Sequence, residues 1–336
     1  MDEGNGHVGN VPAALTKAAT NAGYAPSVHN TQPWRWRVLP DRLELRADRS
    51  RQLTAADPDG HLLLMSCGTA LHHARTALAA DGVTAAVVRL PDPADVDLLA
   101  VLSPIRPAEV TPDEARLAEA ARQRHTDRRP VADEPVGAQA LDAIRHAVAV
   151  ERLDLHVLAP DQVTELAAAA DRAGRVTAAQ PDLAAELAYW TGRSPAGTGL
   201  PDEVLPASQP QTTVPLRDYG REGTLPVGPG HDKAATYAVL FGPDDEPETW
   251  LQAGEALSAA WLVATAHGVS VLPFSGLIEL PDTRQALRHL LAGLGQPYLV
   301  LRLGIAAPAG EPGGAAHTPR LPTAQVVDTS ALHGGA

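Results

Sequence analysis

The sequence has few cysteines, aromatic residues and lysines, and each shortage excludes something. One cysteine, Cys67, occurs among the 336 residues, so an intrachain disulfide is impossible and a reducing compartment is favoured. Its place at the end of an apolar run favours a small buried side chain, with a redox role as the alternative. Aromatic residues make up only 4% of the chain, against 44% hydrophobic residues in all. A substantial core is expected, built mainly from Ala, Leu and Val.

Positive charge is scarce as well. Lys17 and Lys233 are the two lysines, and the formal net charge is −13. Nucleic acids and anionic membranes bind clustered Lys and Arg, so neither is expected as the main partner. The N-terminus has no hydrophobic signal segment, and no apolar run reaches the about 20 residues that cross a bilayer. We therefore expect a soluble, cytoplasmic protein.

Several common functional signatures are missing from the chain. It has no Walker loop for nucleotides and no Gly-x-Ser-x-Gly elbow for a nucleophile. His72, His73 and the scattered histidines lack acidic or cysteine partners at metal-ligand spacing. We interpret them as surface or core histidines and expect no metal site.

The periodicity of the apolar residues predicts an α+β chain. Thr111 is a plausible N-cap, with Pro112 at the first helical position. The predicted helices cover residues 11–22, 61–80, 111–122, 137–149, 160–178, 182–191, 248–266 and 281–292. The predicted strands cover a pair within 35–47, then 83–90, 96–102, 153–158, 237–241 and 298–305, and residues 269–278 are expected to be extended.

The densest group of unusual residues is Ala25-Pro-Ser-Val-His-Asn-Thr-Gln-Pro-Trp34, between the first helix and the first strands. Pro26 and Pro33 stiffen the backbone, so that Ser, Asn and Gln side chains would be presented in fixed positions. Such donors and acceptors suit the edge of a planar heteroaromatic ring. On residue types alone, an ordinary turn with Trp34 and Trp36 as core anchors is the simpler interpretation.

The pattern Ala-Pro-Ser-x-x-Asn-x-Gln-Pro-Trp resembles the FMN-contacting loop of the nitroreductase superfamily. The resemblance implies FMN as cofactor, NAD(P)H as possible electron donor, and flavin N5, not a side chain, as the reactive centre. It also implies that this loop contacts the cofactor through Pro26, Ser27, Val28, Asn30 and Gln32.

A second resemblance lies in the basic loop Arg124-His-Thr-Asp-Arg128, which is similar to the Arg-x-Ser/Thr-x-Arg/Lys element of the same family. There the first basic residue and the hydroxyl bind the FMN phosphate, which Arg124 and Thr126 would do here, with His125 between them as a further cofactor contact. Arg128 would lie by the flavin pyrimidine, where a fixed cation favours the anionic reduced form. From residue types alone, a solvated basic turn after a helix is an equal alternative.

Two further segments resemble parts of the family site. Thr318-Pro-Arg-Leu-Pro322 is similar to the C-terminal basic segment that closes on the phosphate, with Thr318 and Arg320 as ligands, although tails so near a terminus are often frayed. In Pro273-Phe-Ser-Gly276 the backbone would pass the flavin N5, with Pro273, Phe274, Ser275 and Gly276 as contacts. Many family members have an acidic residue where this chain has Ser275, so only a backbone contact is expected there.

The chain also contains an internal repeat. The sequence from Gly68 to Val83 recurs from Gly254 to Val269, with seven identities in sixteen positions. Each copy is a predicted helix that leads into a strand, which indicates two related halves. The two cofactor elements occur once each, in opposite halves, as in a fused nitroreductase dimer. Together with its insertion, this arrangement resembles the Acg-like subfamily over most of residues 11–328.

The expected organisation is therefore a disordered N-terminus at 1–10, nitroreductase-like halves at 11–110 and 111–328 with antiparallel sheets flanked by helices, and a flexible tail at 329–336. The chain would act as a monomeric pseudo-dimer or pair again as a homodimer. Residues 192–233 are rich in Gly, Pro, Ser and Thr, which predicts a lid or disorder, with Trp190 and Tyr219 as residues that could pin it.

Three functions are compatible with these features. The first is an FMN-dependent NAD(P)H oxidoreductase that reduces nitroaromatics, quinones or a similar small-molecule electron acceptor. The second is an FMN-sequestering protein whose insertion covers the flavin. The third is a flavin-dependent tailoring oxidase that acts on one biosynthetic intermediate.

Overall fold

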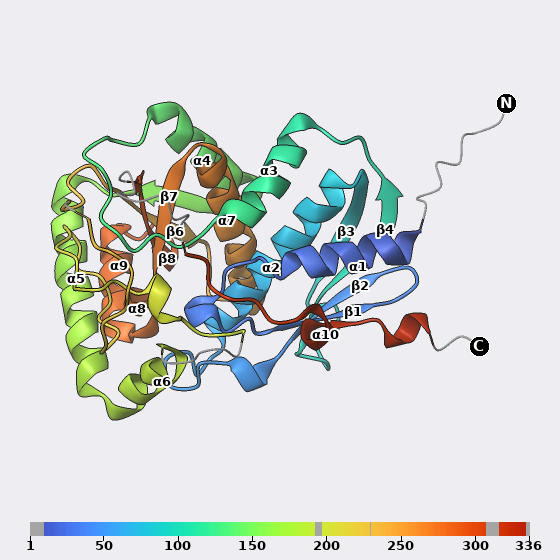
Figure 1. Ribbon diagram of the computed structural model, residues 1–336, viewed down its shortest axis with the longest axis horizontal. Coiled ribbons are helices and arrows are strands. Elements are labelled where there is room, and N and C mark those ends of the chain that lie inside the picture. The colour runs from blue at the N-terminus through green and yellow to red at the C-terminus, as the bar shows by residue number, and fades with distance from the viewer. Residues whose placement is uncertain (1–9, 192–196, 229, 307–315, 334–336) are drawn as a thin grey trace.

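Two β-sheets lie on opposite sides of a central pair of long helices in the computed structural model (Figure 1). The structure describes residues 10–191, 197–228, 230–306 and 316–333. Residues 1–9, which belong to the segment predicted to be disordered, lie outside the described residues. So do parts of the insertion and part of the C-terminal Gly/Pro segment. The α+β class with mainly antiparallel sheets is confirmed.

The first sheet has the strand order β3-β4-β2-β1-β9. In β1, the two tryptophans and Val38 are buried while Arg35 and Arg37 are exposed, as the alternating pattern predicts. β9 is the parallel exception, with Val327 opposite Trp36 of β1. The strands are β1 (Trp34–Val38), β2 (Leu43–Ala47), β3 (Val83–Arg89), β4 (Leu98–Pro107) and β9 (Val327–Asp328).

The second sheet has the order β5-β6-β8-β7, and all its pairings are antiparallel. Strand β8, the third in this order, is buried along almost its whole length, which explains why its sequence is mostly apolar. The strands are β5 (Asp154–Val157), β6 (Thr236–Gly242), β7 (Val269–Phe274) and β8 (Gln296–Ile305).

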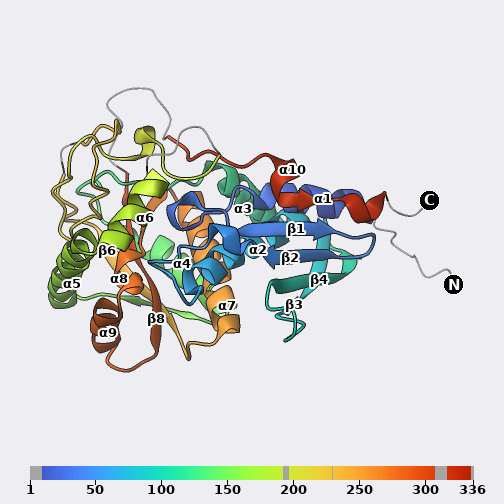
Figure 2. The ribbon, with the colours of Figure 1, turned by 90° about the horizontal axis from the view of Figure 1, so that it is seen from below.

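The helices cover the sheets and form the interface between them (Figure 2). Asn10 caps the first helix, and Thr111 forms the expected N-cap, within a capping box that includes Glu114. The helices are α1 (Val11–Ala22), α2 (His61–Ala80), α3 (Pro112–Gln123), α4 (Ala138–Val150), α5 (Pro160–Ala179), α6 (Pro181–Thr191), α7 (Pro247–Ala266), α8 (Gly276–Glu279), α9 (Pro281–Leu290) and α10 (Thr323–Val326).

Helices α2 and α7 approach each other through two glycines. A Cβ atom on Gly68 would lie 1.9 Å from the carbonyl oxygen of Leu251, and one on Gly254 would lie 1.9 Å from that of Met65. The contact is therefore reciprocal, because each glycine faces the residue three positions before the other glycine. No side chain larger than hydrogen fits at this crossing without moving a helix backbone.

The two sheets also share a connection pattern. Within each, the second strand pairs with the first and the fourth, and a long helix joins the second strand to the third. Gly82 and Gly268, which end those helices, have the same φ of +71°. In the second sheet, α5, α6 and the insertion lie between β5 and β6, where the first sheet has a short turn.

Two parts of the chain differ from the sequence predictions. The expected extended segment 269–278 is a strand only to Phe274, because the carbonyl of Ser275 accepts hydrogen bonds from the amides of Ile278 and Glu279 and starts α8. The short elements α10 and β9 were not predicted. They carry the end of the chain across to the first sheet, beside β1 (Figure 2).

The covering loop, which we define as residues 197–228, has little regular structure but has its own apolar contacts. Leu200, Val204 and Leu205 form a small buried cluster with Tyr219 packed against it. The amide of Leu200 donates to the carbonyl of Trp190, at the end of α6. A hydrogen bond from Arg128 to the Tyr219 hydroxyl connects the covering loop to the basic loop at residues 124–128.

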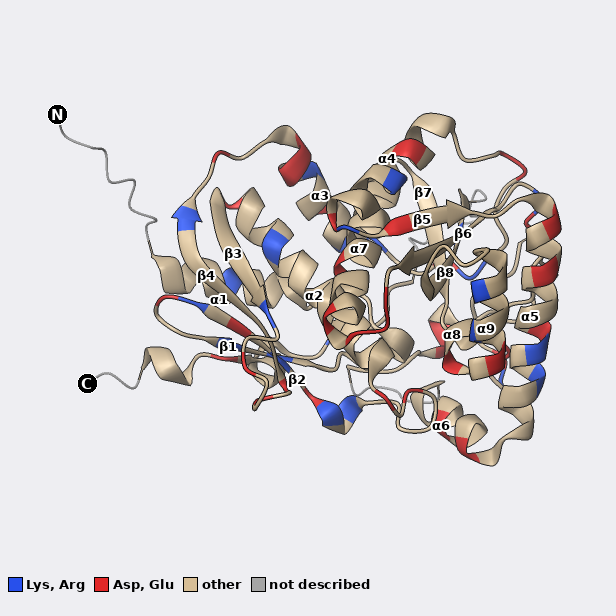
Figure 3. Cartoon of the chain, turned by 180° about the vertical axis from the view of Figure 1, so that it is seen from behind, with Lys and Arg blue, Asp and Glu red and all other residues tan. Residues whose placement is uncertain are grey.

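Within the described residues, none of the helices is long and apolar enough to cross a membrane. Acidic and basic positions are interspersed over both ends of the molecule (Figure 3).

The glycine crossing gives a test of the interface. We expect Gly68→Ala to lower the free energy of unfolding by about 3 kcal/mol or more, because the new methyl group meets backbone rather than a movable side chain. Gly174→Ala is the matched control, since a Cβ on this α5 glycine would have no neighbour within 4 Å. Helix propensity predicts a gain of up to about 1 kcal/mol for the control. Equal urea denaturation midpoints for the two variants would contradict the close crossing.

Candidate functional site

A cavity of about 1390 Å³ brings together residues from all four segments that the sequence singled out. Its wall includes Pro26, Ser27, Val28, Asn30, Arg124, His125, Thr126, Arg128, Pro273, Phe274, Ser275, Gly276, Thr318 and Arg320. Helices α5 and α6 and the covering loop line the rest of the cavity. Residues widely separated in the sequence thus share one site.

The loop before β1 is held in a strained conformation. His29, Asn30 and Gln32 have φ angles of 49°, 56° and 50°, a region that non-glycine residues seldom adopt. The Ser27 hydroxyl oxygen accepts the Gln32 amide at 2.9 Å. The Thr69 hydroxyl of α2 donates to the carbonyl of Pro26 at 2.6 Å. Strain of this kind persists where surrounding contacts enforce it, which is common at binding sites.

The side-chain amides of Asn30 and Gln32 form hydrogen bonds to other segments of the protein. Asn30 Nδ2 donates to the carbonyls of Gly199 and Pro319, at 3.1 and 3.0 Å. Gln32 lies outside the cavity wall, where its Nε2 donates to the Gly197 carbonyl and its Oε1 accepts the amide of Leu321. These two side chains therefore join the covering loop and the C-terminal segment to the first loop.

Arg124 and Arg320 converge on one backbone carbonyl. Each donates to the carbonyl oxygen of Tyr24, at 3.0 and 3.1 Å. The guanidinium of Arg124 lies 4.8 Å above the Trp261 ring of α7, and Arg320 Nη1 donates to the Thr318 hydroxyl at 2.6 Å. Among the described residues, neither arginine has an acidic partner, and the Nε atom of each is buried without a hydrogen bond.

The two guanidiniums make this end of the cavity strongly electropositive. Burial lowers the pKa of Arg124 well below its usual value, and the positive charge of Arg320 lowers it further. Burial also lowers the pKa of Arg320 to about 10. A buried and a half-buried positive charge side by side without a counter-charge are costly, so the site favours an anion with several acceptor oxygens, such as a phosphate.

Arg128 also lacks an acidic partner within the described part of the chain, but it contacts the covering loop. Its Nε donates to the Tyr219 hydroxyl at 3.2 Å, its Nη1 donates to the Val204 carbonyl at 3.2 Å, and its guanidinium lies 5.6 Å from the Tyr219 ring centre. Tyr219 therefore connects the covering loop to the basic loop by contacting Arg128. Tyr219 is one of the two residues that the sequence analysis considered for this role.

The other residues of the basic loop have different contacts. Thr126 forms a parallel bridge with Val271 of β7. The ring of His125 lies edge-on to that of His317, with 5.6 Å between centroids. Burial lowers the pKa of His317, and the electrostatic effects of His125, Arg124 and Arg320 lower it further. His317 was not predicted as a site residue, although it directly precedes the predicted Thr318.

The segment from Pro273 to Gly276 forms part of the cavity wall. A Cβ on Gly276 would lie 2.6 Å from Nη2 of Arg217. Arg217 belongs to the covering loop and forms an ion pair with Glu279 of α8. The close approach that Gly276 allows is thus made here by an arginine side chain.

His29 and Arg217 are further cavity residues that were not predicted as site residues. Burial lowers the pKa of His29 well below its usual value, and the nearby positive charges of Arg217 and Arg128 lower it further. His29 occupies a variable position inside the recognised motif. Arg217 lies in a stretch without periodicity, so the sequence contained no signal that could place it.

A pair of buried histidines lies behind the site, at the α2–α7 crossing. His72 Nδ1 and His73 Nδ1 both contact the Ser258 hydroxyl, at 2.8 and 2.9 Å. Burial lowers the pKa of His73 well below its usual value, with Arg124 and His72 adding to the shift. These are core histidines, as expected, and no group of three or more metal-binding side chains occurs among the described residues.

Comparisons with known proteins identify the family. No protein-family model matches the chain. A Mycobacterium tuberculosis protein with the provisional name NAD(P)H nitroreductase Rv3131 is 38% identical over 320 residues, covering 92% of this chain and 89% of the relative. The M. tuberculosis protein acg, also provisionally named an NAD(P)H nitroreductase, is 34% identical over 316 residues, covering 93% of this chain and 94% of its own. The chain belongs to the nitroreductase family, as the loop motifs indicated.

Solved structures show a weaker likeness. An FMN-bound nitroreductase from Bacteroides fragilis is 16% identical, with a TM-score of 0.37, and the match covers 59% of this chain and 91% of that one. The nitroreductase NfnB of Mycobacterium smegmatis, solved with NADPH, is 17% identical, with a TM-score of 0.37 and coverages of 62% and 97%. Scores at this level add nothing to the family assignment.

The buried histidines predict how stability depends on pH. Burial, aided by the charge of Arg75, lowers the pKa of His72 to about 4 in the folded protein, whereas an unfolded chain has a histidine pKa of about 6.5. The unfolded state therefore binds the proton first, so stability is lost as pH falls below about 6.5. When the pH falls from 7 to 5, the free energy of unfolding of the wild-type protein should decrease by about 2 kcal/mol more than that of the His72→Asn variant. Urea titrations of both proteins at the two pH values check this, and equal losses would show that His72 is not held neutral.

Proposed function

We propose that the protein is an FMN-binding oxidoreductase that uses NAD(P)H to reduce small molecules such as nitroaromatics or quinones by two electrons. The observation that carries this proposal is the pair Arg124 and Arg320, each with a buried Nε atom that lacks a hydrogen bond. The pair has no counter-charge within the described structure and lies in the wall of a large cavity. The relatives' names, which include NAD(P)H nitroreductase, support the same activity.

The residues present fit FMN. The orphaned Nε atoms of Arg124 and Arg320 are donors that a phosphate would satisfy, and the hydroxyls of Thr126 and Thr318 lie in the same wall. Arg128 would then lie toward the flavin pyrimidine, and the backbone at Gly276 toward N5. When bound, FMN supplies hydride acceptance and donation, which no side chain of the cavity can provide.

The protein's own contribution is binding and electrostatics. Arg128, buried and without an acidic partner among the described residues, would stabilise negative charge on the pyrimidine side of the ring. The cavity of about 1390 Å³ exceeds the about 300–1,000 Å³ typical of single-ligand pockets. The extra space, between α5, α6 and the covering loop, would admit the nicotinamide donor or the acceptor beside the cofactor.

We also propose that the chain is a fused form of the two-subunit arrangement. The reciprocal contact of Gly68 and Gly254, the shared strand order and the matching glycines that end α2 and α7 all support two related halves. Each cofactor site would then need both halves, and a single chain would suffice for one site. A cytoplasmic location remains a prediction from the composition.

A second function is favoured by the covering loop. Tyr219 and the Val204 carbonyl accept two of the hydrogen bonds that Arg128 can donate, and Arg217 lies against Gly276. If these contacts persist with FMN bound, the loop would keep nicotinamide out, and the protein would sequester FMN instead of using it for turnover.

Replacing Arg124 and Arg128 together with Ala should give a colourless protein, because the phosphate and the pyrimidine would each lose a cationic partner. Arg175→Ala is the matched control, since Arg175 also lines the cavity but is exposed and paired with Asp171. FMN content per chain, measured after reconstitution and desalting, checks both variants. A full equivalent of FMN in the double variant would refute the assignment of the site.

A further inference from the structure

Arg302 is a charged residue where the sequence predicts none. It lies in the middle of β8, whose other residues from Tyr298 to Ile305 are uncharged, and it is 1% exposed. Such a position normally selects an apolar side chain. The contacts of Arg302 must therefore explain why a charge is placed there.

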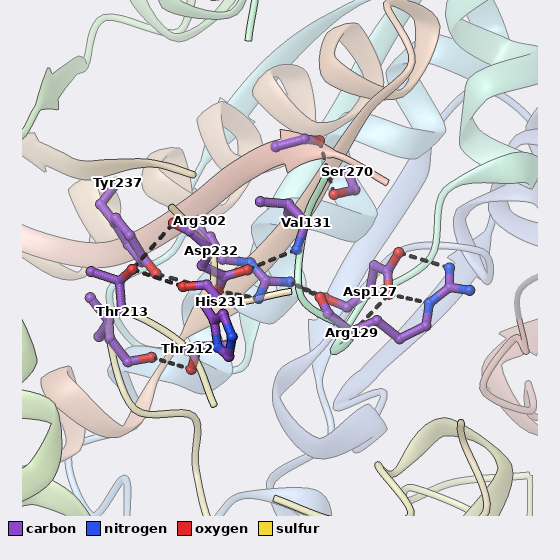
Figure 4. Close-up of polar contacts among 12 residues, drawn as sticks. Asp127, Arg129, Val131, Thr212, Thr213, His231, Asp232, Tyr237, Ser270 and Arg302 are labelled. Atoms are coloured by element: carbon purple, nitrogen blue, oxygen red, sulfur yellow. Dashed lines mark hydrogen bonds and ion pairs between the residues drawn. The ribbon is translucent and has the colours of Figure 1, made fainter. Parts of the chain in front are cut away.

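The side chain of Arg302 connects to the basic loop (Figure 4). Its Nη2 donates to the carbonyl oxygens of Asp127 and Arg129, at 2.8 and 2.7 Å. These are the residues on either side of Arg128. Asp127 and Arg129 also pair with each other through their side chains, at 2.9 Å. Both neighbours of Arg128 are thus fixed, and Arg128 extends to the cavity wall.

Asp232 completes this arrangement (Figure 4). Its carboxylate pairs with Arg302 Nη1 at 2.8 Å and accepts the amide of Val131 at 2.8 Å. Asp232 has a φ of 57° and ends the insertion, where the Thr213 hydroxyl donates to its carbonyl at 3.3 Å. The pair therefore joins three segments: β8, the basic loop and the end of the insertion.

Stability alone is a poor reason for this pair. Two charges buried this completely lose their hydration, and replacing such a pair with uncharged residues often costs nothing. In the described structure, Arg302 Nε also has no hydrogen-bond partner. What an apolar residue could not do is hold the two carbonyls that flank Arg128.

We propose that Arg302 and Asp232 are positioning residues that fix the Arg128 guanidinium for the cofactor, an inference that rests on the proposed FMN site. They touch neither the cavity nor a ligand, and they act through the backbone of residues 127–131. Their loss leaves Arg128 present but no longer held in one place.

The test uses the double variant Arg302→Met with Asp232→Asn. It leaves no unpaired buried charge, and Asn tolerates the left-handed backbone and can still accept the Val131 amide. Arg128→Met is made alone and in combination with the double variant. Glu255→Gln is the control for a buried ion pair away from the cavity, since Glu255 pairs with Arg75 and Arg89.

The measurements are the FMN dissociation constant, by flavin fluorescence, and the flavin midpoint potential. We expect the double variant to bind FMN at least about tenfold more weakly, as when supporting partners are removed from other sites, and to shift the potential to more negative values. Because the effect passes through Arg128, the triple variant should match Arg128→Met in both quantities. The Glu255→Gln control should keep both wild-type values.

Unchanged affinity and potential in the double variant, with both altered in Arg128→Met, would overturn the positioning role while the FMN site stands. Additive effects in the triple variant would overturn it too, because they would show a route that does not include Arg128. If wild-type protein binds no FMN, the proposed function itself fails and the inference falls with it. Arg302→Lys keeps the charge that pairs with Asp232 but not the two-carbonyl contact, so it should fold as the wild-type protein does and still show the more negative potential.

Discussion

The crossing of α2 and α7 at Gly68 and Gly254 is the constraint on which the rest of the structure depends. Because the two backbones touch, the faces of both helices that flank the crossing reach the same cavity. Thr69 of α2 holds the first loop through the carbonyl of Pro26, and Trp261 of α7 lies beneath Arg124 of the basic loop. A wider crossing would separate the two loops. The site thus depends on the close packing of α2 against α7 between the two sheets.

Electrostatics then sets what the site can hold. In a chain of net charge −13, three arginines without acidic partners among the described residues lie in the wall of one cavity. Arg124 and Arg128 are buried and Arg320 is half-buried. Arg124 and Arg320 share a carbonyl and leave donors free, which suits a phosphate. Arg128 is held from behind by the Arg302 network and contacts the covering loop in front. If FMN binds as proposed, it would contact the same cation that the covering loop contacts, so turnover and sequestration would both depend on Arg128.

The sequence predicted features that depend on neighbouring residues and missed those that depend on distant ones. The capping box at Thr111, the alternating burial of β1 and the stiff loop at Pro26 follow from local chemistry. β9 was missed because Val327 pairs with Trp36 across almost the whole chain, a contact that no local pattern encodes. Gln32 was recognised as important by its motif, yet its observed partners, Gly197 and Leu321, come from segments without periodicity. Arg217 was missed for the same reason.

The most direct test of the account is an anaerobic absorbance measurement on FMN-loaded protein mixed with NADPH, then NADH. The variant Tyr219→Phe, which removes the hydroxyl that Arg128 contacts, is run alongside. The account predicts that the visible band of oxidised flavin bleaches in the wild-type protein, and at least as fast in the variant. A band that persists in both proteins with either nucleotide would contradict an NAD(P)H-dependent reductase and leave FMN sequestration as the function of the site.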